Sequence, residues 1–336
     1  MCSLPVFVGL DYHQDAVQVC VMDRPGQILT NREVANDWEA IVARAEAYGR
    51  VVGVGIEACT GAANLAEELI QKAGWSVDLA HPGYVNRMRQ NPDKHDWGDA
   101  RLLADLERVG YLPRVWLAPE EIRELRRLVN YRQQIVNERR NVKLRVSALL
   151  RDQRLRYRQG KSWTLRWLAW LKQVELSPQG RWIVDRYLSR MELIREELQL
   201  VENRLTQLTK DDSLVNALQQ QKGIGPTTAW VIRAHIGRFD RFRSGKQLSR
   251  FCGLSPRNAS SGTRQADAGL IKAGNAYLRS TLIEAAHRLI RYEPEWCARA
   301  ERLLRQGKPK CVVIAAMANR WMRWLFHQMQ PERLAA

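Results

Sequence analysis

Four acidic residues could support phosphodiester chemistry: Asp11, Glu57, Asp96 and Asp99. Asp11 closes the apolar run VFVGLD and Glu57 closes VVGVGIE, so each stands at the end of a predicted strand. Asp96 and Asp99 lie three residues apart in KHDWGDARLLADL, which puts both on one face of a helix. Hard divalent cations bind carboxylate oxygens, and two such ions can stabilise the attacking and leaving oxygens of a phosphodiester. The four residues therefore predict a Mg²⁺ or Mn²⁺ site.

Each of these carboxylates also has an ordinary structural interpretation. Acidic residues are common at strand ends and in the first turn of helices, where they cap the backbone or complement the helix dipole. The joint pattern favours the metal site over that interpretation. Asp105 lies two turns further along the same helix and is not expected to join the site. His13, two residues after Asp11, is expected on the other face of the sheet.

A second candidate for chemistry is the serine pair Ser260 and Ser261, which lies between Arg257 and Arg264. A serine hydroxyl in an arginine-rich loop could attack a phosphodiester while guanidinium groups neutralise the developing charge. Ser-Ser-Gly is also ordinary turn composition, and on the residues alone a loop without chemistry is the favoured interpretation.

The elements that would position the acidic residues form an α/β pattern. Three strand-like runs come first. They are followed by a helix, a buried strand, a second helix, a last strand and a last helix. The strands are expected at residues 6–11, 16–23, 26–36, 51–58 and 76–81. The order βββαβαβα is that of the ribonuclease-H-like fold. In that fold the strands that end at Asp11 and Glu57 are neighbours.

From Glu120 the apolar spacing becomes helical and coiled-coil-like, in two helices separated by residues 151–173. We expect a long arm that turns back on itself and presents a basic, aromatic tip. Its candidate nucleic-acid contacts are Arg156, Arg158, Lys161 and Arg166, and its aromatic candidates for RNA or for a partner subunit are Trp163, Trp167 and Trp170. A hairpin that only dimerises fits the spacing equally well.

The third region is expected to be mainly helical. QKGIGPTTAWVIRAHIG (221–237) resembles a helix-hairpin-helix, whose turn at Gly223 and Gly225 could hold a phosphate. The segment that follows Gly253 is rich in Gly, Ser and Arg and is expected to be a loop. Lys272, just before an amphipathic helix, is a further candidate for nucleic-acid binding.

The charge is divided unevenly along the chain. The 336 residues carry a formal charge of +17, but residues 1–112 have a net charge of −6, residues 113–210 of +11 and residues 211–336 of +12. A basic excess of this size indicates a polyanion, most plausibly nucleic acid. The six cysteines form no C-x-x-C pair, so a zinc finger is unsupported. Neither a signal peptide nor a membrane-spanning run is found, and a cytoplasmic protein is expected.

Six short motifs in a fixed order give the chain a family resemblance. The motifs resemble those of the DEDD-type insertion-sequence transposases and are VGLDYHQD, GIEACTGA, KHDWGDARLLA, GIGPTTA, GLSPRNASSG and IKAGNAYLR. These transposases are related to the Piv/MooV-like invertases, and they are described as bridge-RNA-guided recombinases. The resemblance spans residues 6 to about 290 and is to the family as a whole.

The resemblance implies a RuvC-like domain at residues 1–112, a coiled-coil arm at 113–210 and a transposase domain at 211–336. It maps an acidic, Mg²⁺-binding tetrad onto the four carboxylates named above. It maps a nucleophilic serine onto Ser261, with Ser260 as the fallback, and so reverses the interpretation of that loop. The resemblance also implies a covalent phosphoserine intermediate, a guide RNA, and donor and target DNA. It further implies homodimers that assemble into a tetramer and a bacterial, nucleoid-associated protein.

Two other functions stay open. A metal-dependent ribonuclease-H-like junction nuclease would need the tetrad but not Ser261, because water would be its nucleophile. A non-catalytic scaffold that binds nucleic acid would need neither. The sequence does not identify the RNA, the DNA targets, or whether the reaction is insertion, excision or inversion.

Overall fold

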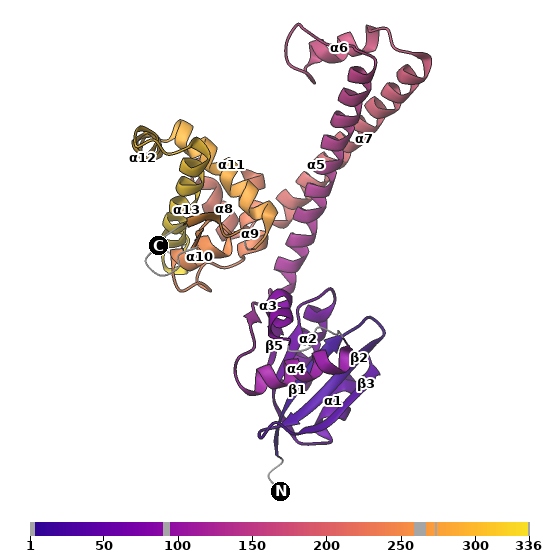
Figure 1. Ribbon diagram of the computed structural model, residues 1–336, viewed down its shortest axis with the longest axis vertical. Helices are drawn as coiled ribbons and strands as arrows, with labels where there is room; N and C mark the ends of the chain where they lie inside the picture. The colour runs from indigo at the N-terminus through magenta and orange to yellow at the C-terminus, as the bar shows by residue number, and fades with distance from the viewer. Residues whose placement is uncertain (1–3, 90–94, 259–266, 273, 335–336) are drawn as a thin grey trace. The chain divides into compact units, whose positions relative to one another are not determined.

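The computed structural model describes residues 4–89, 95–258, 267–272 and 274–334, and the chain divides into two compact units, residues 1–119 and 120–336. The first unit is a mixed α/β unit built on a six-stranded sheet, and the second is mainly helical, as the composition and spacing predicted. Each unit is described by itself (Figure 1).

The first unit contains the strands β1 (Pro5–Tyr12), β2 (Ala16–Asp23), β3 (Ile28–Ala35), β4 (Arg50–Glu57), β5 (Val77–Ala80) and β6 (Arg114–Val115). The spatial order is β3-β2-β1-β4-β5-β6. β1 pairs antiparallel with β2 and parallel with β4, and β5 continues parallel to β4. The helices are α1 (Trp38–Glu46), α2 (Ala62–Ala73), α3 (Pro82–Met88) and α4 (Asp96–Arg108). The short α3 was not predicted; Pro82 at its first turn begins it.

Both faces of the sheet are covered. Val8, Leu10 and Val19 pack with α1 and α2 in one core, while Cys20 and Met22 pack with α4 on the other face. Gly9 of β1 allows α4 to approach closely, because a Cβ at Gly9 would lie 2.0 Å from the Ala100 carbonyl oxygen. The part of α4 that carries Ala100 and Ala104, just beyond its first turn, is therefore held against the central strand.

The second unit begins with two long helices, α5 (Glu120–Asp152) and α7 (Pro178–Leu208), which lie side by side (Figure 1). Ile135 and Val142 of α5 and Ile194 and Leu198 of α7 share one hydrophobic core. The short α6 (Leu165–Gln173) lies at the far end of the pair. We call α5, α6, α7 and the segment between them the arm. Supercoiling of the two helices remains a prediction.

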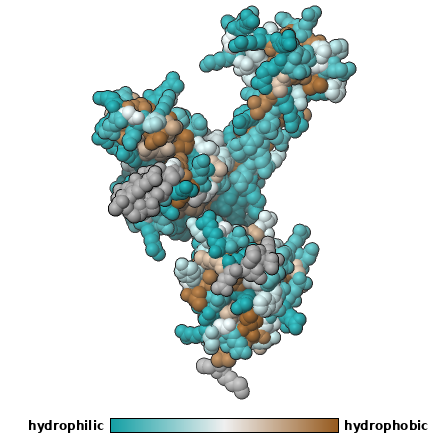
Figure 2. Space-filling view, in the orientation of Figure 1, coloured by the Kyte–Doolittle hydropathy of each residue, from teal (hydrophilic) through white to brown (hydrophobic). Residues whose placement is uncertain are grey.

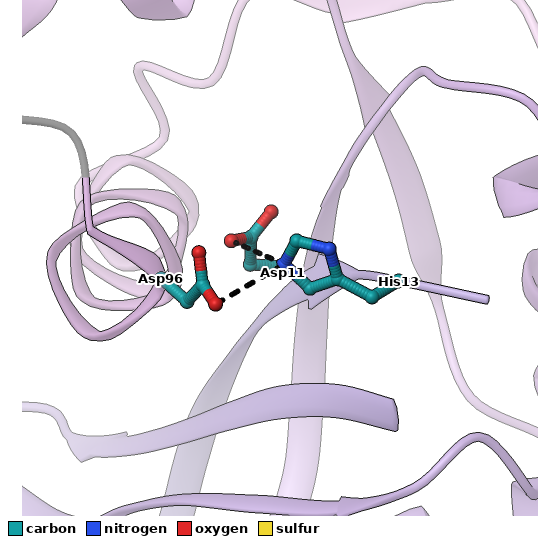
Figure 3. Close-up of side chains that lie close together, drawn as sticks. All are labelled: Asp11, His13 and Asp96. Atoms are coloured by element: carbon teal, nitrogen blue, oxygen red, sulfur yellow. Dashed lines mark ion pairs between the residues drawn. The ribbon is translucent and has the colours of Figure 1, made fainter. Parts of the chain in front are cut away.

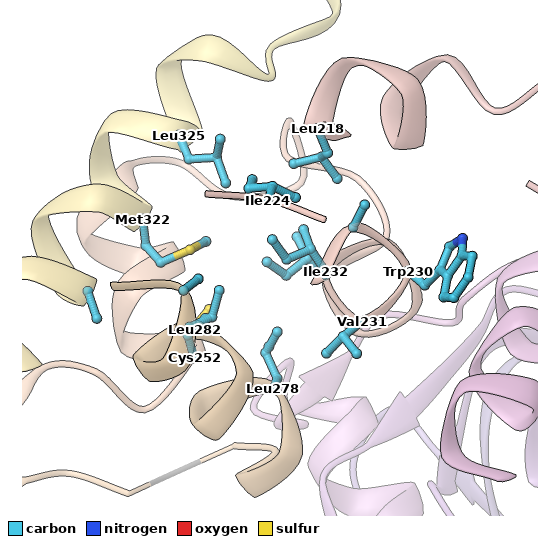
Figure 4. Close-up of a cluster of buried hydrophobic side chains, with 14 of the residues drawn as sticks. Leu218, Ile224, Trp230, Val231, Ile232, Cys252, Leu278, Leu282, Met322 and Leu325 are labelled. Atoms are coloured by element: carbon cyan, nitrogen blue, oxygen red, sulfur yellow. The ribbon is translucent and has the colours of Figure 1, made fainter. Parts of the chain in front are cut away.

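The remaining elements of the second unit follow the arm, and most of their helices share one hydrophobic core (Figure 4). They are α8 (Ser213–Gln220), α9 (Pro226–Ile236), α10 (Gly245–Phe251), β7 (Pro256–Asn258), β8 (Asp267–Leu270), α11 (Ala276–Tyr292), α12 (Pro294–Arg305), α13 (Lys310–Gln328) and α14 (Pro331–Leu334). β7 and β8 form an antiparallel ribbon in a region expected to be a loop. Among the described residues, no helix is long and apolar enough to cross a membrane.

Candidate catalytic site

Two parallel strands bring the first two predicted carboxylates to one edge of the sheet. Asp11 is the penultimate residue of β1, and Glu57 is the last residue of β4. The strands are in register at Leu10 and Ile56, the residues immediately before them, so Asp11 and Glu57 lie beside each other along the backbone. The side chain of Asp11 is 14% exposed, so it is largely buried at this edge.

The first turn of α4 supplies the other two carboxylates. His95 caps this helix, because its Nδ1 accepts a hydrogen bond of 2.8 Å from the Gly98 backbone N–H. Asn31 of β3 donates a hydrogen bond of 2.9 Å to the carbonyl of Trp97. The first turn, which begins at Asp96, is thus fixed by a cap and by a contact to the sheet.

Asp11 and Asp96 meet at His13 (Figure 3). The Nε2 atom of His13 lies 3.4 Å from Oδ2 of Asp11 and 3.3 Å from Oδ2 of Asp96. One ligand atom of each of the three residues lies within 4.8 Å of the others, so the three side chains are close enough to hold one metal ion. The expectation that His13 points to the other face is wrong, because residues i and i+2 leaving a strand share a face. That spacing could have revealed His13.

Asp99 has a different environment. Its side chain is 6% exposed, and its Oδ2 accepts a hydrogen bond of 2.7 Å from Nη2 of Arg89, at the end of α3. A buried carboxylate needs such a partner, because removing a charge from water is costly. Arg89 was not singled out from the sequence, since nothing in the spacing shows that it reaches the first turn of α4.

Glu57 does not join the His13 cluster, but its charge acts close by. Burial raises the pKa of the Cys59 thiol, and the negative charges of Glu57 and Asp11 raise it further. Both carboxylates therefore act on the segment that follows β4. The structure brings Asp11 and Asp96 together, places Glu57 at the same edge, and pairs Asp99 with Arg89.

The donor chemistry of this edge fits a hard divalent cation. Asp11 and Asp96 offer oxygen ligands, the type that Mg²⁺ and Mn²⁺ prefer. Asp96 is half exposed, so an ion and a phosphate oxygen can reach it from solvent.

The predicted serine segment lies between β7 and β8 in the sequence. Ser260, Ser261 and Arg264 are outside the described residues. Arg257 is exposed on β7. Lys272, which follows β8, is exposed and has a φ of 52°, the left-handed region that lysine rarely adopts.

The predicted phosphate-binding turn precedes α9. Gly223 has a φ of 85°, which favours glycine, and Gly225 is the N-cap of α9. Arg288, which the sequence analysis did not select, donates a hydrogen bond of 3.1 Å to Oγ1 of Thr228 and one of 3.3 Å to the carbonyl of Gly223. The turn is therefore braced by a cation from α11.

The arm separates its predicted contacts into exposed and buried groups. Arg156, Arg158, Lys161 and Arg166 are all exposed. Trp167 is 2% exposed and packs with Val146, Leu150, Leu171 and Val184 in the core of the arm's end. Its indole is therefore unavailable as a platform for bases.

Two sequence models of one transposase family match the chain. The model described as "Transposase", of the DEDD IS110 type, matches residues 8–153, and the model described as "Transposase IS116/IS110/IS902 family" matches residues 215–301. Together they match well over half of the chain. The first match includes all four predicted carboxylates, and the second includes the serine pair.

Two relatives that match most of the chain carry transposase descriptions. The chain is 28% identical over 339 residues to the "Probable family 20 transposase" of Pseudomonas aeruginosa, and the matched region covers 97% of both proteins. It is 26% identical over 288 residues to the "Transposase for insertion sequence element IS1111A" of Coxiella burnetii, with 85% of this chain and 78% of the relative covered. With an acidic edge on its α/β unit and both family matches, the chain belongs to the IS110/IS116 family of insertion-sequence transposases.

Proposed function

We propose that this transposase cuts and rejoins DNA strands at the edge formed by Asp11, Glu57, Asp96 and Asp99. The observation that carries the proposal is the meeting of Asp11 and Asp96, which come from a strand end and a helix 85 residues apart in sequence. Two carboxylates brought this close, one of them largely buried, repel each other unless a cation lies near them. The order and directions of the strands also support a ribonuclease-H-like, RuvC-like fold for this unit.

The four carboxylates would hold Mg²⁺ or Mn²⁺, with Asp11 and Asp96 as the central ligands. The bound ion would supply electrostatic stabilisation for the charge that develops on phosphate oxygens. Arg89 holds Asp99 in an ion pair and so orients the first turn of α4. The N-cap at His95 and the contact of Asn31 with Trp97 fix the same turn.

Ser261 would be the nucleophile. Its hydroxyl oxygen would attack the phosphorus, forming a phosphoserine bond, and the strand end would leave as a hydroxyl after taking up a proton. Rejoining reverses these steps with a different strand end. Ser260 is the alternative nucleophile, since the two serines are adjacent.

A structured guide RNA would pair with donor and target DNA, and the protein would bind shape and backbone. The basic excess of residues 113–336 supports this part of the proposal, because a nucleic-acid backbone is its natural counterion. Arg156, Arg158, Lys161, Arg166, Arg257, Arg264 and Lys272 are the proposed contacts, together with the turn at Gly223 and Gly225. Homodimers that assemble into a tetramer are proposed as the active form.

The test uses purified full-length protein, the candidate flanking RNA, labelled donor and target DNA, and Mg²⁺. A denaturing gel separates free DNA from a covalent protein–DNA adduct for the wild type, Ser261→Ala, Ser260→Ala and Asp11→Ala. We expect the adduct to disappear with Ser261→Ala, to persist with Ser260→Ala and to weaken with Asp11→Ala. Cleavage without an adduct, unchanged in both serine variants, would instead support the metal-dependent nuclease. Binding with no strand cleavage by any variant would support the scaffold.

A further inference from the structure

A groove runs along the side of the arm, between the middle of α5, the segment that carries α6, and α7. It has a volume of about 720 Å³, within the range of about 300–1,000 Å³ typical of ligand sites. Four basic side chains line it, together with one carboxylate and one indole: Arg139, Lys143, Lys172, Arg195, Glu192 and Trp163. We call it the arm groove. Of the tip residues selected from the sequence, it includes Trp163 but not Arg156, Arg158, Lys161 or Arg166.

The arm groove is strongly electropositive. Glu192 is its single acidic lining residue, and it pairs with Arg195 three residues along α7. Within the described parts of the chain, no ion pair involves the other three cations, Arg139, Lys143 and Lys172. Burial lowers the pKa of Lys143, and repulsion from Arg139 lowers it further. An anionic ligand would relieve that repulsion.

The arm groove also has an apolar part, in which the flat, partly exposed Trp163 indole is accompanied by aliphatic side chains that include Leu165. The Trp163 indole packs on Trp167 with 4.5 Å between ring centroids, and the Lys143 ammonium lies 5.3 Å from the Trp163 ring. Beside it Leu165, at the start of α6, is 86% exposed. Figure 2 shows hydrophobic residues exposed at this end of the arm.

The backbone of Trp163 is in a rare conformation. Its φ is 66°, the left-handed region that a bulky side chain seldom adopts. Such conformations persist only where the surrounding structure enforces them, and they gather at functional sites. Here the buried Trp167 and the N-cap at Thr164, which accepts a hydrogen bond from the Trp167 N–H, hold the Trp163 segment in place.

We propose that the arm groove binds an unpaired stretch of a nucleic-acid strand, with a base against Trp163 and Leu165 and the backbone phosphates on Arg139, Lys143 and Lys172. The inference rests on the proposed function in one respect, that the protein handles nucleic acid. A flat apolar surface beside uncompensated cations matches the two faces of a single strand. Duplex DNA covers its base faces by stacking, so it could use only the cations.

The charges also argue against a second copy of the chain as the occupant. Residues 113–210, which include the arm, have a net charge of +11, so a second arm would add cations to the cationic groove. RNA and DNA single strands share the required chemistry, and the experiment separates them.

The test measures binding of fluorescein-labelled 12-nucleotide RNA, the same DNA single strand and the corresponding blunt DNA duplex to the full-length protein by fluorescence anisotropy. The groove variant is Lys143→Glu with Lys172→Glu. The control is Arg186→Glu with Arg204→Glu, which makes the same charge change at exposed positions of α7 outside the arm groove.

We expect the groove variant to bind the preferred single strand at least 10-fold more weakly, and the control to lose less than 3-fold. The salt dependence of single-strand binding should fall by a slope of about 1.4 in the groove variant, since each lost phosphate contact removes about 0.7. Trp163→Leu should weaken single-strand binding several-fold while leaving duplex binding unchanged, because only base stacking is lost.

Equal losses in the groove variant and the control would overturn the inference, as would an unchanged affinity with Trp163→Leu. Loss of a dimer in the groove variant, measured by light scattering with no nucleic acid present, would assign the arm groove to a second copy instead. The adduct assay separates the two proposals. If the wild-type protein forms the adduct and the groove variant binds the single strand normally, only this inference is contradicted. If no adduct forms, only the proposed function is contradicted.

Discussion

The two units position charged side chains in opposite ways. In the α/β unit, carboxylates lie at the ends of β1 and β4 and in the first turn of α4, so regular backbone fixes where they stand. In the second unit most cations lie on exposed helix surfaces, and the indole of the arm groove lies in an irregular segment. Regular backbone at a sheet edge is therefore enough to position an acidic site. The position of a basic surface instead depends on which side of each helix packs into the core and which side stays exposed.

The variant expected to disturb the α/β unit most is Gly9→Ala, which tests how firmly α4 is held against β1. The new Cβ would lie 2.0 Å from the Ala100 carbonyl oxygen and 2.4 Å from the Ala104 nitrogen, so α4 would have to move away from β1. We expect a loss of about 3 kcal/mol or more in the free energy of unfolding, measured by urea denaturation. Gly74→Ala is the control, because its Cβ would meet nothing within 4 Å and only its φ of 69° is unfavourable, at about 1 kcal/mol. Equal losses in the two variants would show that α4 is not held by this contact.

The ion pair between Arg89 and Asp99 tests whether the acidic edge is also a structural element. Arg89→Met leaves a carboxylate that is 6% exposed without its partner, and we expect a loss of about 3 kcal/mol in stability. The double variant Arg89→Met, Asp99→Asn should recover most of that loss, because it removes the charge as well. Thermal unfolding measures both. If the double variant is no more stable than Arg89→Met, the loss has another origin.

A buried histidine in the second unit provides the corresponding pH test. Burial, together with the positive charge of the nearby Arg126, lowers the pKa of His235 from 6.5 to about 4. Between these values the unfolded chain binds the proton and the folded chain does not, so stability falls as the pH decreases from 6.5 towards 4. We expect His235 to account for about 2–3 kcal/mol of that loss. Urea denaturation across this range should give a shallower pH dependence for His235→Gln, and identical curves would exclude the effect.

The smallest predicted effect compares two helix caps within the α/β unit. Asp37 caps α1 and His95 caps α4, so replacing either by alanine should cost about 1 kcal/mol. Of these two caps, only His95 lies at the turn that carries Asp96. We therefore expect similar losses in thermal stability but a decrease in DNA cleavage for His95→Ala alone. Cleavage that falls equally in both variants would separate the cap from the site.

Much of the α/β unit could be predicted because its signals are local. Alternating and continuous apolar runs define β1, β2 and β4, and the element order then indicates which strands are neighbours. The same logic selected Asp11 and Asp96, although their catalytic roles remain proposals. The helical character of the second unit followed from its spacing for the same reason.

What could not be predicted depends on contacts between distant segments. Nothing local shows that Arg89 reaches Asp99, or that Arg288 braces the turn at Gly223. Trp163 and Trp167 lie four residues apart and pack against the same core at the arm's end, but Trp167 is buried while Trp163 is only partly buried and lines the arm groove. Spacing identifies an aromatic cluster and not which ring remains accessible.

The central claim is that the edge with Asp11 and Asp96 is the catalytic site. The most direct measurement compares Mg²⁺-dependent DNA strand cleavage and DNA affinity for Asp11→Asn, Asp96→Asn and Asp105→Asn. Asp105 lies on the same helix but pairs with Arg108 at 2.5 Å, so it controls for a lost charge on α4. We predict that Asp11→Asn and Asp96→Asn reduce the cleavage rate by at least 100-fold at unchanged DNA affinity, and that Asp105→Asn cleaves normally. Cleavage at the wild-type rate by Asp11→Asn and Asp96→Asn would contradict the account.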